Sequence, residues 1–240
     1  MLTGKKVLVI GLARSGKAAV KLLQKLNATI TINEGKELEK IEGYQEYLDA
    51  GIEIIAGGHP DELFERDFDF VVKNPGINYH KPFILRLKER GIPVYTEIEL
   101  GYKVAKKQHY IAVTGTNGKT TTTALTGAIL REYYESVYVV GNIGLPYTEY
   151  ALETKDSSVT VAEVSSFQLE TIHSFQPDVS AILNITPDHL NRHHTMECYI
   201  DTKARIAENQ TKDQICVLNY EDEHLRKMAE KIPADVFWFS

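Results

Sequence analysis

Short apolar segments alternate with helical segments along the whole chain, and this alternation restricts the folds open to it. In the first hundred residues, strands are expected at residues 5–10, 29–32, 52–55, 68–72 and 92–95, and helices at residues 15–26 and 82–90. Apolar strands that alternate with helices are typical of parallel sheets covered on both faces. The pattern therefore predicts an α/β fold.

The pattern restarts after a polar, lysine-rich stretch at residues 102–109, which we interpret as a helix end and a linker. Strands are expected at residues 110–114, 137–140, 158–164, 179–185, 214–219 and 234–240, with a helix at residues 199–208. We predict two α/β domains with parallel sheets, one over residues 1–104 and one over residues 105–240. The second domain is expected to be incomplete at its C-terminus, because a central sheet rarely stops on a bare strand.

Charge and cysteine usage exclude several classes of protein. The 33 acidic residues outnumber the 27 basic ones, whereas a dedicated nucleic-acid binder normally carries a basic face. No run of about eighteen apolar residues occurs, so no membrane span is predicted, and the apolar run near the N-terminus is interpreted as a buried strand rather than a signal peptide. Cys198 and Cys216 form no metal-ligand pattern and are typical of reduced thiols. We expect a cytoplasmic monomer with no nucleic-acid or membrane partner.

The stretch AVTGTNGKTTTTA, residues 112–124, is similar to a phosphate-binding loop between a strand and a helix. Backbone N–H groups at a helix N-terminus bind anions, Lys119 would reach the β- and γ-phosphates of ATP, and the Thr120 hydroxyl would coordinate Mg²⁺. The usual motif has a glycine where Val113 stands, so an ordinary glycine turn is the alternative. The strand context and the further threonines favour nucleotide binding, for which the candidates are Gly115, Thr116, Asn117, Gly118, Lys119, Thr120 and Thr121.

The first strand–helix turn, GLARSG at residues 11–16, lies where a dinucleotide fingerprint would lie, but Ala13 replaces the middle glycine. Glu34, near the end of the second strand, could be the acidic ribose partner. A structural turn and a ligand-binding turn are equally compatible with these residues. If a ligand binds there, Arg14 and Ser15 would add donors, and the turn KNPGI, which contains Gly76, could line the same crevice.

Polar residues follow the apolar strands of the second half. Glu163 ends a strand, so its carboxylate either points to solvent or faces a cation; the strand end beside a phosphate loop is where a metal-binding acid belongs. The histidines of NITPDHLNRHH fit no zinc spacing, and a polar loop is the ordinary interpretation. His189, nearest the strand end, is the preferred site residue. Lys203 lies within a predicted helix, where most lysines are solvated.

Five motifs in order resemble the Mur ligases: GTNGKTT, VGNIGLP, EVSSFQLE, LNITPDHLNRH and TKARIAEN. The resemblance covers the whole chain, and in that family a loop without the leading glycine is normal. The resemblance implies three domains: a Rossmann-like domain over residues 1–104 that binds the UDP substrate, a P-loop-type, parallel-sheet ATPase domain over residues 105–240, and a domain that binds the incoming amino acid. The third domain and the end of the second are expected to be absent from this sequence.

The resemblance also implies roles for matching positions. Lys119 becomes the γ-phosphate ligand, Thr120, Glu163 and His189 become Mg²⁺ ligands, and Lys203 matches a lysine carried as a carbamate, which would add to the metal site. The catalytic set is then Lys119, Glu163, His189 and Lys203. Asn142, Ser165, Gln168 and His189 would contact the substrate or orient the metal shell. Arg14, Ser15, Asn33 and Gly76 would recognise the uridine. Ala13, Arg14 and Asn33 differ from the residues usual in the family.

The implied reaction is the ATP-dependent addition of D-glutamate to UDP-N-acetylmuramoyl-L-alanine through an acyl phosphate, in peptidoglycan precursor synthesis. The 240-residue piece alone is expected to bind without turning over. The alternatives are another Mur or folylpolyglutamate-type ligase, a dinucleotide-dependent oxidoreductase built on the first domain, and a nucleotide-gated switch without ligase chemistry.

Overall fold

The computed structural model describes residues 2–240, which divide into two compact units, Met1–Leu100 and Gly101–Ser240. Each unit contains one sheet, and every strand pair in both sheets is parallel. The predicted α/β class is therefore confirmed.

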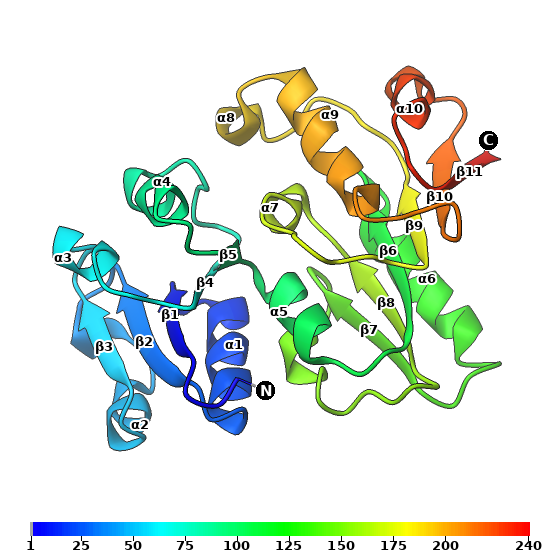
Figure 1. Cartoon of the computed structure of the whole chain (residues 1–240). Coiled ribbons are helices and arrows are strands. Elements are labelled where there is room, and N and C mark those ends of the chain that lie inside the picture. The colour runs from blue at the N-terminus through cyan, green and yellow to red at the C-terminus, as the bar shows by residue number, and fades with distance from the viewer. Residues whose placement is uncertain (1) are drawn as a thin grey trace. The chain divides into compact units, whose positions relative to one another are not determined.

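The sheet of the first unit has the order β3-β2-β1-β4-β5 (Figure 1). Its strands are β1 (Lys6–Ile10), β2 (Thr29–Glu34), β3 (Glu53–Ala56), β4 (Phe70–Lys73) and β5 (Val94–Tyr95). The helices are α1 (Arg14–Lys25), η1 (Leu38–Lys40), α2 (Tyr44–Asp49), α3 (Asp61–Phe64) and α4 (Pro82–Glu89). The chain leaves β1 toward β2 and later returns to β4, so the strand order reverses between β1 and β4. In open α/β sheets, ligands bind outside the carboxyl ends of the strands at such a switch point.

Both faces of this sheet are buried, as a parallel sheet requires. Leu8 and Ile10 of β1 pack in one core cluster with Phe64 of α3 and Leu87 of α4. The alternate residues Val7 and Val9 are also fully buried. Helix α1 buries Ala18, Ala19, Leu22 and Leu23, a stripe at helical spacing that explains its amphipathic sequence.

The sheet of the second unit has the order β11-β10-β9-β6-β8-β7. Its strands are β6 (His109–Thr114), β7 (Val137–Gly141), β8 (Val159–Glu163), β9 (Val179–Ile182), β10 (Ile215–Asn219) and β11 (Asp235–Phe239). The helices are α6 (Lys119–Leu130), η2 (Tyr147–Glu149), α7 (Ser166–Leu169), α8 (Leu190–His193), α9 (Met196–Ala204), η3 (Arg205–Ala207) and α10 (Glu223–Ala229), and α5 (Glu97–Val104) spans the boundary between the units.

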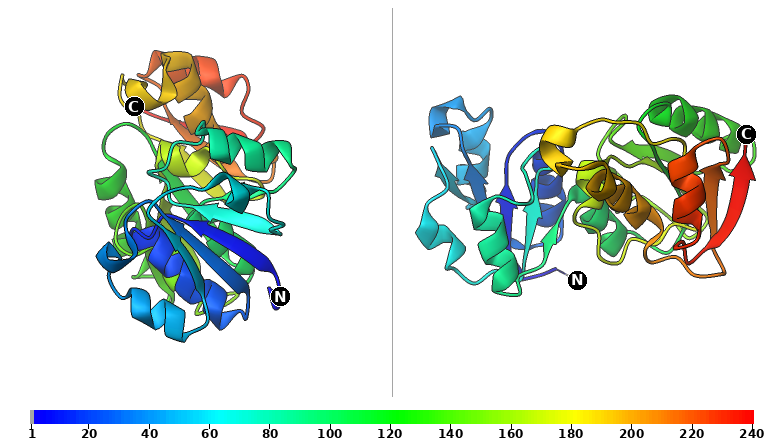
Figure 2. Two further views of the ribbon diagram at one scale, coloured as in Figure 1. Left: turned by 90° about the vertical axis from the view of Figure 1, so that its left-hand side faces the viewer. Right: turned by 90° about the horizontal axis from the view of Figure 1, so that it is seen from above.

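Helix α6 covers one face of this sheet, and α9 and α10 cover the other (Figures 1 and 2). The chain moves along the sheet in one direction from β6 to β7 and in the opposite direction from β9 through β10 to β11. Because both crossovers are right-handed, their helices lie on opposite faces of the sheet. The carboxyl ends of β6, β8 and β9 therefore meet at the edge where the phosphate loop begins.

The structure contains a strand at each position where the sequence predicts one. The strand expected at residues 179–185 ends at Ile182, because the backbone beyond it turns to the phosphate loop: Asn184 accepts a hydrogen bond from the N–H of Thr116 (2.9 Å). The helix expected at residues 199–208 begins earlier, at Met196, where the Thr195 hydroxyl caps it. The short helices α2, α3, α7, α8 and α10 were not predicted.

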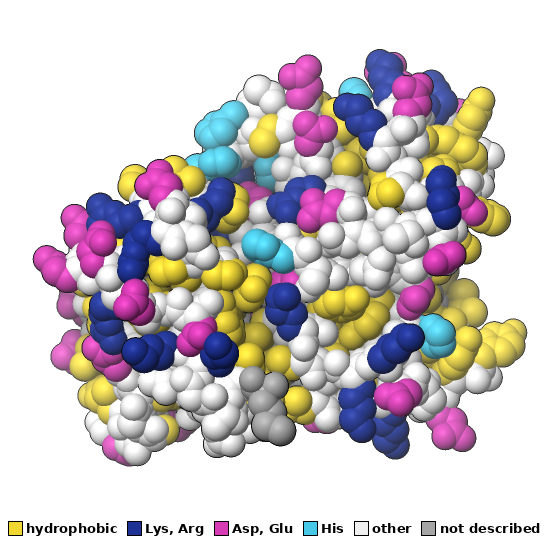
Figure 3. Space-filling view, in the orientation of Figure 1, with side chains coloured by type: hydrophobic (Ala, Val, Ile, Leu, Met, Phe, Trp, Pro, Cys, Tyr) yellow, Lys and Arg dark blue, Asp and Glu magenta, His cyan; other side chains and the backbone are white. Residues whose placement is uncertain are grey.

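Cationic and anionic side chains are interspersed on the face shown in Figure 3. Hydrophobic side chains gather at the edge where Figure 1 places β11, whose Phe237, Trp238 and Phe239 are exposed. Within residues 2–240, none of the helices has the length and apolar character needed to span a bilayer.

Candidate functional site

The predicted phosphate loop is a strand–turn–helix corner between β6 and α6. Gly118 is the N-cap of α6 and has a φ of 82°, in the left-handed region that favours glycine. Lys119 is the first residue of the twelve-residue helix. The loop therefore presents its amides at a helix N-terminus, as an anion site requires.

Residues that follow β9 hold this loop. The side chain of Asn184 accepts from the N–H of Asn117 (2.8 Å) and donates to the carbonyl of the same residue (3.0 Å). The Thr116 hydroxyl donates to the carbonyl of Thr186 (3.2 Å) and accepts from its N–H (3.0 Å). The prediction omitted Asn184 and Thr186. The signal for them was present, since both follow an apolar strand, but the pairing of that strand with β6 is a tertiary fact.

Glu163 lies at the centre of a polar cluster beside the loop. Its side chain is only 1% exposed, so of the two alternatives, the one in which it points to solvent is wrong. The Thr120 hydroxyl donates to one carboxylate oxygen (2.8 Å), and the Asn142 amide donates to the other (2.7 Å). No ion pair to this carboxylate occurs within residues 2–240. A buried carboxylate and a hydroxyl are oxygen donors of the kind that Mg²⁺ prefers, so these residues fit that ion.

The sheet register places these three side chains together. Glu163 of β8 pairs with Val113 of β6 on one side and with Gly141 of β7 on the other. Thr120 and Asn142 follow these neighbouring strands closely, so all three side chains reach the same edge of the sheet.

Gly141 offers a test of this arrangement. It has a φ of 100°, and a Cβ there would lie 2.4 Å from the Glu163 carbonyl oxygen; Gly144 has a φ of 62°, but its Cβ would meet nothing closer than 3.4 Å. We expect Gly144→Ala to lower the free energy of unfolding by about 1–2 kcal/mol, which is the strain of a left-handed residue. Gly141→Ala should lower it by at least about 2 kcal/mol more, because the backbone of Glu163 must move to make room for the methyl group. Chemical denaturation measures both, and equal losses would contradict the packing argument.

Lys203 lies on the inner face of α9 and is 1% exposed, contrary to the usual solvated lysine. Its ammonium nitrogen donates to the Gly115 carbonyl (2.8 Å) and lies 4.8 Å from the centre of the Tyr199 ring. Burial, assisted by the positive charge of Lys119 and opposed by Asp188, lowers the pKa of Lys203 to about 7. A substantial fraction of this amine is therefore uncharged near neutral pH.

Lys119 bends back over its own loop. Its ammonium nitrogen donates to the Thr116 carbonyl (2.9 Å), and the side chain is half-buried. The Gly115 carbonyl thus accepts a hydrogen bond from Lys203, and the Thr116 carbonyl accepts one from Lys119. Thr121 lies exposed in the first turn of α6.

Ser165 and Gln168 bind each other. They form a capping box at the start of α7, in which the side-chain oxygen of Gln168 accepts from both the N–H and the hydroxyl of Ser165 (2.9 Å each). His189 lies elsewhere, half-exposed at the start of α8, with Nε2 3.4 Å from Asp188 and its ring 4.9 Å from that of Phe167. Among residues 2–240, no hydrogen bond or ion pair joins His189 to Glu163, so its predicted role in metal binding stays a prediction.

The predicted uridine residues belong to the first unit. Asn74 joins two of them, because its amide donates to the Ser15 hydroxyl (3.0 Å) and its carbonyl accepts from the N–H of Gly76 (2.9 Å). Arg14 is exposed at the first position of α1. Asn33 is fully buried, and it donates to the carbonyls of Ile55 (3.0 Å) and Gly58 (2.8 Å). Direct contact between Asn33 and a substrate stays a prediction.

The GLARSG turn has a structural reason for its last glycine. A Cβ at Gly16 would lie 1.9 Å from the carbonyl oxygen of Gly11, so only glycine permits α1 to pack this closely on the turn. Glu34 accepts a hydrogen bond from the N–H of Leu12 (2.7 Å) and thereby fixes the same turn. These contacts support the interpretation of GLARSG as a structural turn. They also place the Glu34 carboxylate at the end of β2.

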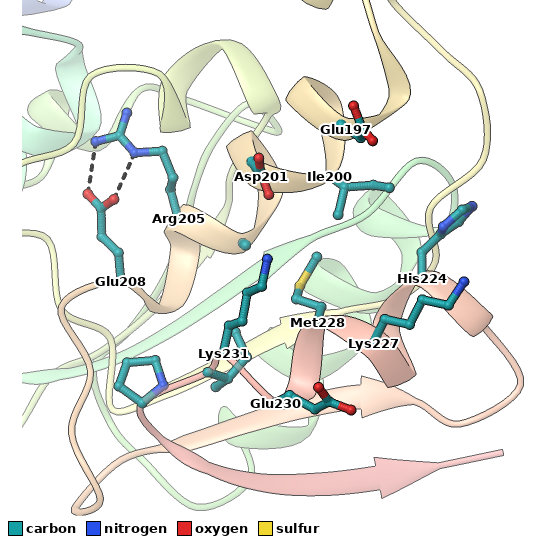
Figure 4. Close-up of a pocket in the computed structure, with 13 residues that line it drawn as sticks. Glu197, Ile200, Asp201, Arg205, Glu208, His224, Lys227, Met228, Glu230 and Lys231 are labelled. Carbon is teal, nitrogen blue, oxygen red and sulfur yellow. Dashed lines mark hydrogen bonds and ion pairs between the residues drawn. The ribbon is translucent and has the colours of Figure 1, made fainter.

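A separate cavity of about 730 Å³ lies between α9 and α10 (Figure 4). Ile200 and Met228 form part of its apolar surface, Glu197 and Asp201 come from α9, and Lys227 comes from α10. No predicted site residue lines it. Within residues 2–240, no group of three or more His, Cys, Asp or Glu side chains could hold a metal ion, so the fit to Mg²⁺ depends on one carboxylate and neighbouring oxygens.

Two family models match the chain. Residues 5–96 match the N-terminal domain of MurD-like Mur ligases, and residues 113–240 match the Mur ligase middle domain. Together they include both the GLARSG turn and the phosphate loop.

Curated relatives match over the full length of this chain. The UDP-N-acetylmuramoylalanine–D-glutamate ligase of Lachnoclostridium phytofermentans is 52% identical over 239 residues, which are 99% of this chain and 52% of that protein. The enzymes of the same name from Lachnospira eligens and Clostridioides difficile are 53% and 48% identical, and each match covers 100% of this chain and 53% of the relative. The chain thus spans about half the length of the curated relatives it matches.

Solved structures share the fold. The UDP-N-acetylmuramate:L-alanyl-γ-D-glutamyl-meso-diaminopimelate ligase from Neisseria meningitides superimposes with a TM-score of 0.63 at 17% identity, covering 99% of this chain and 78% of that one. A murein peptide ligase from Psychrobacter arcticus gives 0.59 at 17% identity, covering 98% of this chain and 53% of that one. The two family models together cover most of the sequence, and the chain therefore belongs to the Mur ligase family.

Proposed function

We propose that this chain takes part in the ATP-dependent addition of D-glutamate to UDP-N-acetylmuramoyl-L-alanine, a step in peptidoglycan precursor synthesis in the cytoplasm. Residues 1–104 bind the UDP substrate and residues 105–240 bind ATP. The partners are these small molecules, and the protein acts as a monomer. The support is the name shared by the curated relatives, together with the geometry of the phosphate loop.

One observation carries the nucleotide part of the proposal. The buried carboxylate of Glu163 accepts a hydrogen bond from Thr120, the second residue of the helix that the phosphate loop opens. In P-loop enzymes, a threonine at this position and an acid at the end of a neighbouring strand hold the magnesium of a bound nucleotide. A glycine turn without a ligand gives no reason to bury an unpaired carboxylate there.

The reaction needs two anions to approach each other, since the substrate carboxylate attacks the γ-phosphorus of ATP. Loop amides and Lys119 bind the β- and γ-phosphates and neutralise part of their charge. ADP leaves and an acyl phosphate forms. The amine of D-glutamate then attacks the activated carbonyl, and the tetrahedral intermediate expels phosphate to leave the amide.

Thr120 and Glu163 would hold Mg²⁺, with His189 and a modified Lys203 as further candidates. When bound, the ion supplies positive charge beside the transferring phosphoryl group. Asn142 donates to Glu163 and thereby orients the carboxylate. Ser165 and Gln168, which brace each other at the start of α7, would position the muramoyl-alanine part of the substrate.

Lys203 is proposed to carry a carbamate. An uncharged amine attacks CO₂ at carbon and loses one proton, which gives an N-carboxylate with a single negative charge. The lowered pKa of Lys203, about 7, makes that uncharged amine available near neutral pH. The product is an anion beside a site for a cation.

Titration with UDP-N-acetylmuramoyl-L-alanine tests the substrate class. We expect calorimetry to give a dissociation constant on the order of micromolar, with no heat from NAD at the same concentration. Binding of NAD in place of the uridine nucleotide would favour the oxidoreductase alternative.

Phosphate release separates a ligase from a nucleotide-gated switch. A ligase releases phosphate only when both UDP-N-acetylmuramoyl-L-alanine and D-glutamate are present, whereas a switch hydrolyses ATP regardless of D-glutamate. Because the 240-residue chain spans about half the length of its relatives and is expected to bind without turning over, it should release no phosphate by itself, whereas phosphate release from ATP without D-glutamate would favour the switch.

A further inference from the structure

The loop after β3 carries a histidine whose ring is held in one orientation at the strand-end edge of the first unit. His59 Nδ1 lies 2.5 Å from the side-chain oxygen Oδ1 of Asn33, and its ring packs at a tilt against Phe83 with 4.5 Å between the centres. The Gly57 N–H donates to the Lys36 carbonyl (2.8 Å), which ties this loop to the segment after β2.

The hydrogen bonds determine which ring nitrogen carries the proton. The amide nitrogen of Asn33 faces two backbone carbonyls, so the other atom of that side chain must be its oxygen, which only accepts. His59 Nδ1 lies against that oxygen and must therefore be the protonated nitrogen. In an uncharged ring, Nε2 is then left with a lone pair and acts as an acceptor.

The ring is uncharged at neutral pH. Partial burial of the ring lowers the pKa of His59 below its ordinary value of 6.5; the neighbouring Glu34 opposes this shift and Lys81 adds to it. Nε2 has no hydrogen-bond partner within residues 2–240, and the histidine is exposed at the surface. An acceptor is thus held at a defined position and open to a ligand.

His59 Nε2 lies near the place that the base of a bound nucleotide takes in doubly wound folds. In doubly wound folds, the pyrophosphate lies at the first βα turn and the ribose lies at the acid that ends the second strand, which is Glu34 here. Because β3 lies next to β2 on the side away from β1, a base beyond the ribose lies over the ends of β2 and β3. A Cβ on Gly35 would lie 3.7 Å from His59 Nε2, so the missing side chain of Gly35 leaves room there.

We propose that His59 Nε2 accepts the N3–H of uracil and so selects uridine over cytidine nucleotides, with Asn33 acting as a positioning residue through His59. This inference rests on the proposed UDP substrate. Uracil N3 is a donor, whereas cytosine N3 is an acceptor that would meet the Nε2 lone pair. Buried Asn33, whose amide nitrogen and oxygen both form hydrogen bonds within this unit, thereby contributes to recognition through His59.

The test compares UDP and CDP binding by calorimetry at pH 7.5. We expect the wild-type chain to prefer UDP, and we expect His59→Phe, which keeps an aromatic ring on Phe83, to reduce the ratio of the two affinities about tenfold, the effect of about one hydrogen bond to a defined acceptor. An unchanged ratio in a folded His59→Phe variant overturns the inference and leaves the UDP substrate class intact. Failure of the wild type to bind UDP overturns both.

A second variant leaves the His59–Asn33 pair in place. Gly35→Val adds a branched side chain whose Cβ would lie 3.7 Å from Nε2, at a residue whose φ lies outside the left-handed region. We therefore expect UDP affinity to fall at least about tenfold without loss of thermal stability. Wild-type UDP affinity in this variant overturns the proposal. The two-bond ¹H–¹⁵N spectrum of the wild type reads the tautomer directly, and a proton on Nε2 in the uncharged ring also overturns it.

Discussion

Lys119→Ala is expected to lower the affinity for ATP about 100-fold and to abolish acyl-phosphate formation. Lys119 is the first residue of α6 and its ammonium group donates to the loop carbonyl of Thr116. We propose that this group contacts the terminal phosphates of bound ATP. A hydrogen bond between charged groups contributes about 1.5–3 kcal/mol, and its loss corresponds to a ten- to hundredfold change or slightly more.

Isothermal titration calorimetry with ATP and magnesium measures the effect. Lys107→Ala, which removes an exposed lysine outside the loop, is the matched control and should bind ATP as the wild type does. The affinity for UDP-N-acetylmuramoyl-L-alanine should survive in both variants, because the predicted uridine residues lie in the other unit. Wild-type ATP affinity in Lys119→Ala would refute the role assigned to this lysine.

The stability of the chain should rise with pH above 7 because of Lys203. Its pKa is about 7 in the folded protein against an ordinary value of 10.5. Between these two pH values Lys203 holds a proton in the unfolded state that it has lost in the folded state, so the free energy of unfolding increases with pH. Below pH 7 the lysine is charged in both states, and burial of the ammonium group lowers stability by its full amount. The slope approaches 1.4 kcal/mol per pH unit, or about 3 kcal/mol between pH 7 and pH 9.5.

Other groups also titrate, so the measurement is a difference between variants. Urea denaturation of the wild type and of Lys203→Met across this pH range should give curves that diverge by about 3 kcal/mol, while Lys107→Met should follow the wild type. Parallel curves for Lys203→Met would show that the Lys203 pKa is close to that of a solvated lysine.

The same uncharged amine is the basis of the proposed carbamate. With ¹³C-labelled bicarbonate, the wild type should show a carbamate carbon resonance that Lys203→Met lacks. An identical spectrum for the two variants would remove the carbamate from the proposed site without affecting the stability argument.

The phosphate loop was predictable because its signals are local. Glycines in a turn, a strand before it and a lysine at the start of a helix all lie within one short segment, and the backbone geometry of such a corner depends on those residues alone. The strands were predictable for a related reason, since continuous apolar runs bounded by turns are typical of buried parallel strands.

The partners of the site residues were not predictable. Nothing in the local sequence states that Asn184 braces the loop, that Asn142 and Thr120 share the Glu163 carboxylate, or that Asn33 fixes the His59 ring. Each of these contacts joins segments that become neighbours only through the order of strands in a sheet.

The sequence by itself determined the α/β class, the division into two α/β units and the place of the phosphate loop, because these follow from hydrophobic periodicity and turn chemistry within short windows. Only the tertiary structure decided that Glu163 and Lys203 are buried rather than solvated. As a result, Glu163 is a carboxylate without an ionic partner within the described residues, and Lys203 is an amine with a lowered pKa. The physical reason is that the hydration of a charge depends on every segment packed around it, and the sheet brings those segments together from distant parts of the chain.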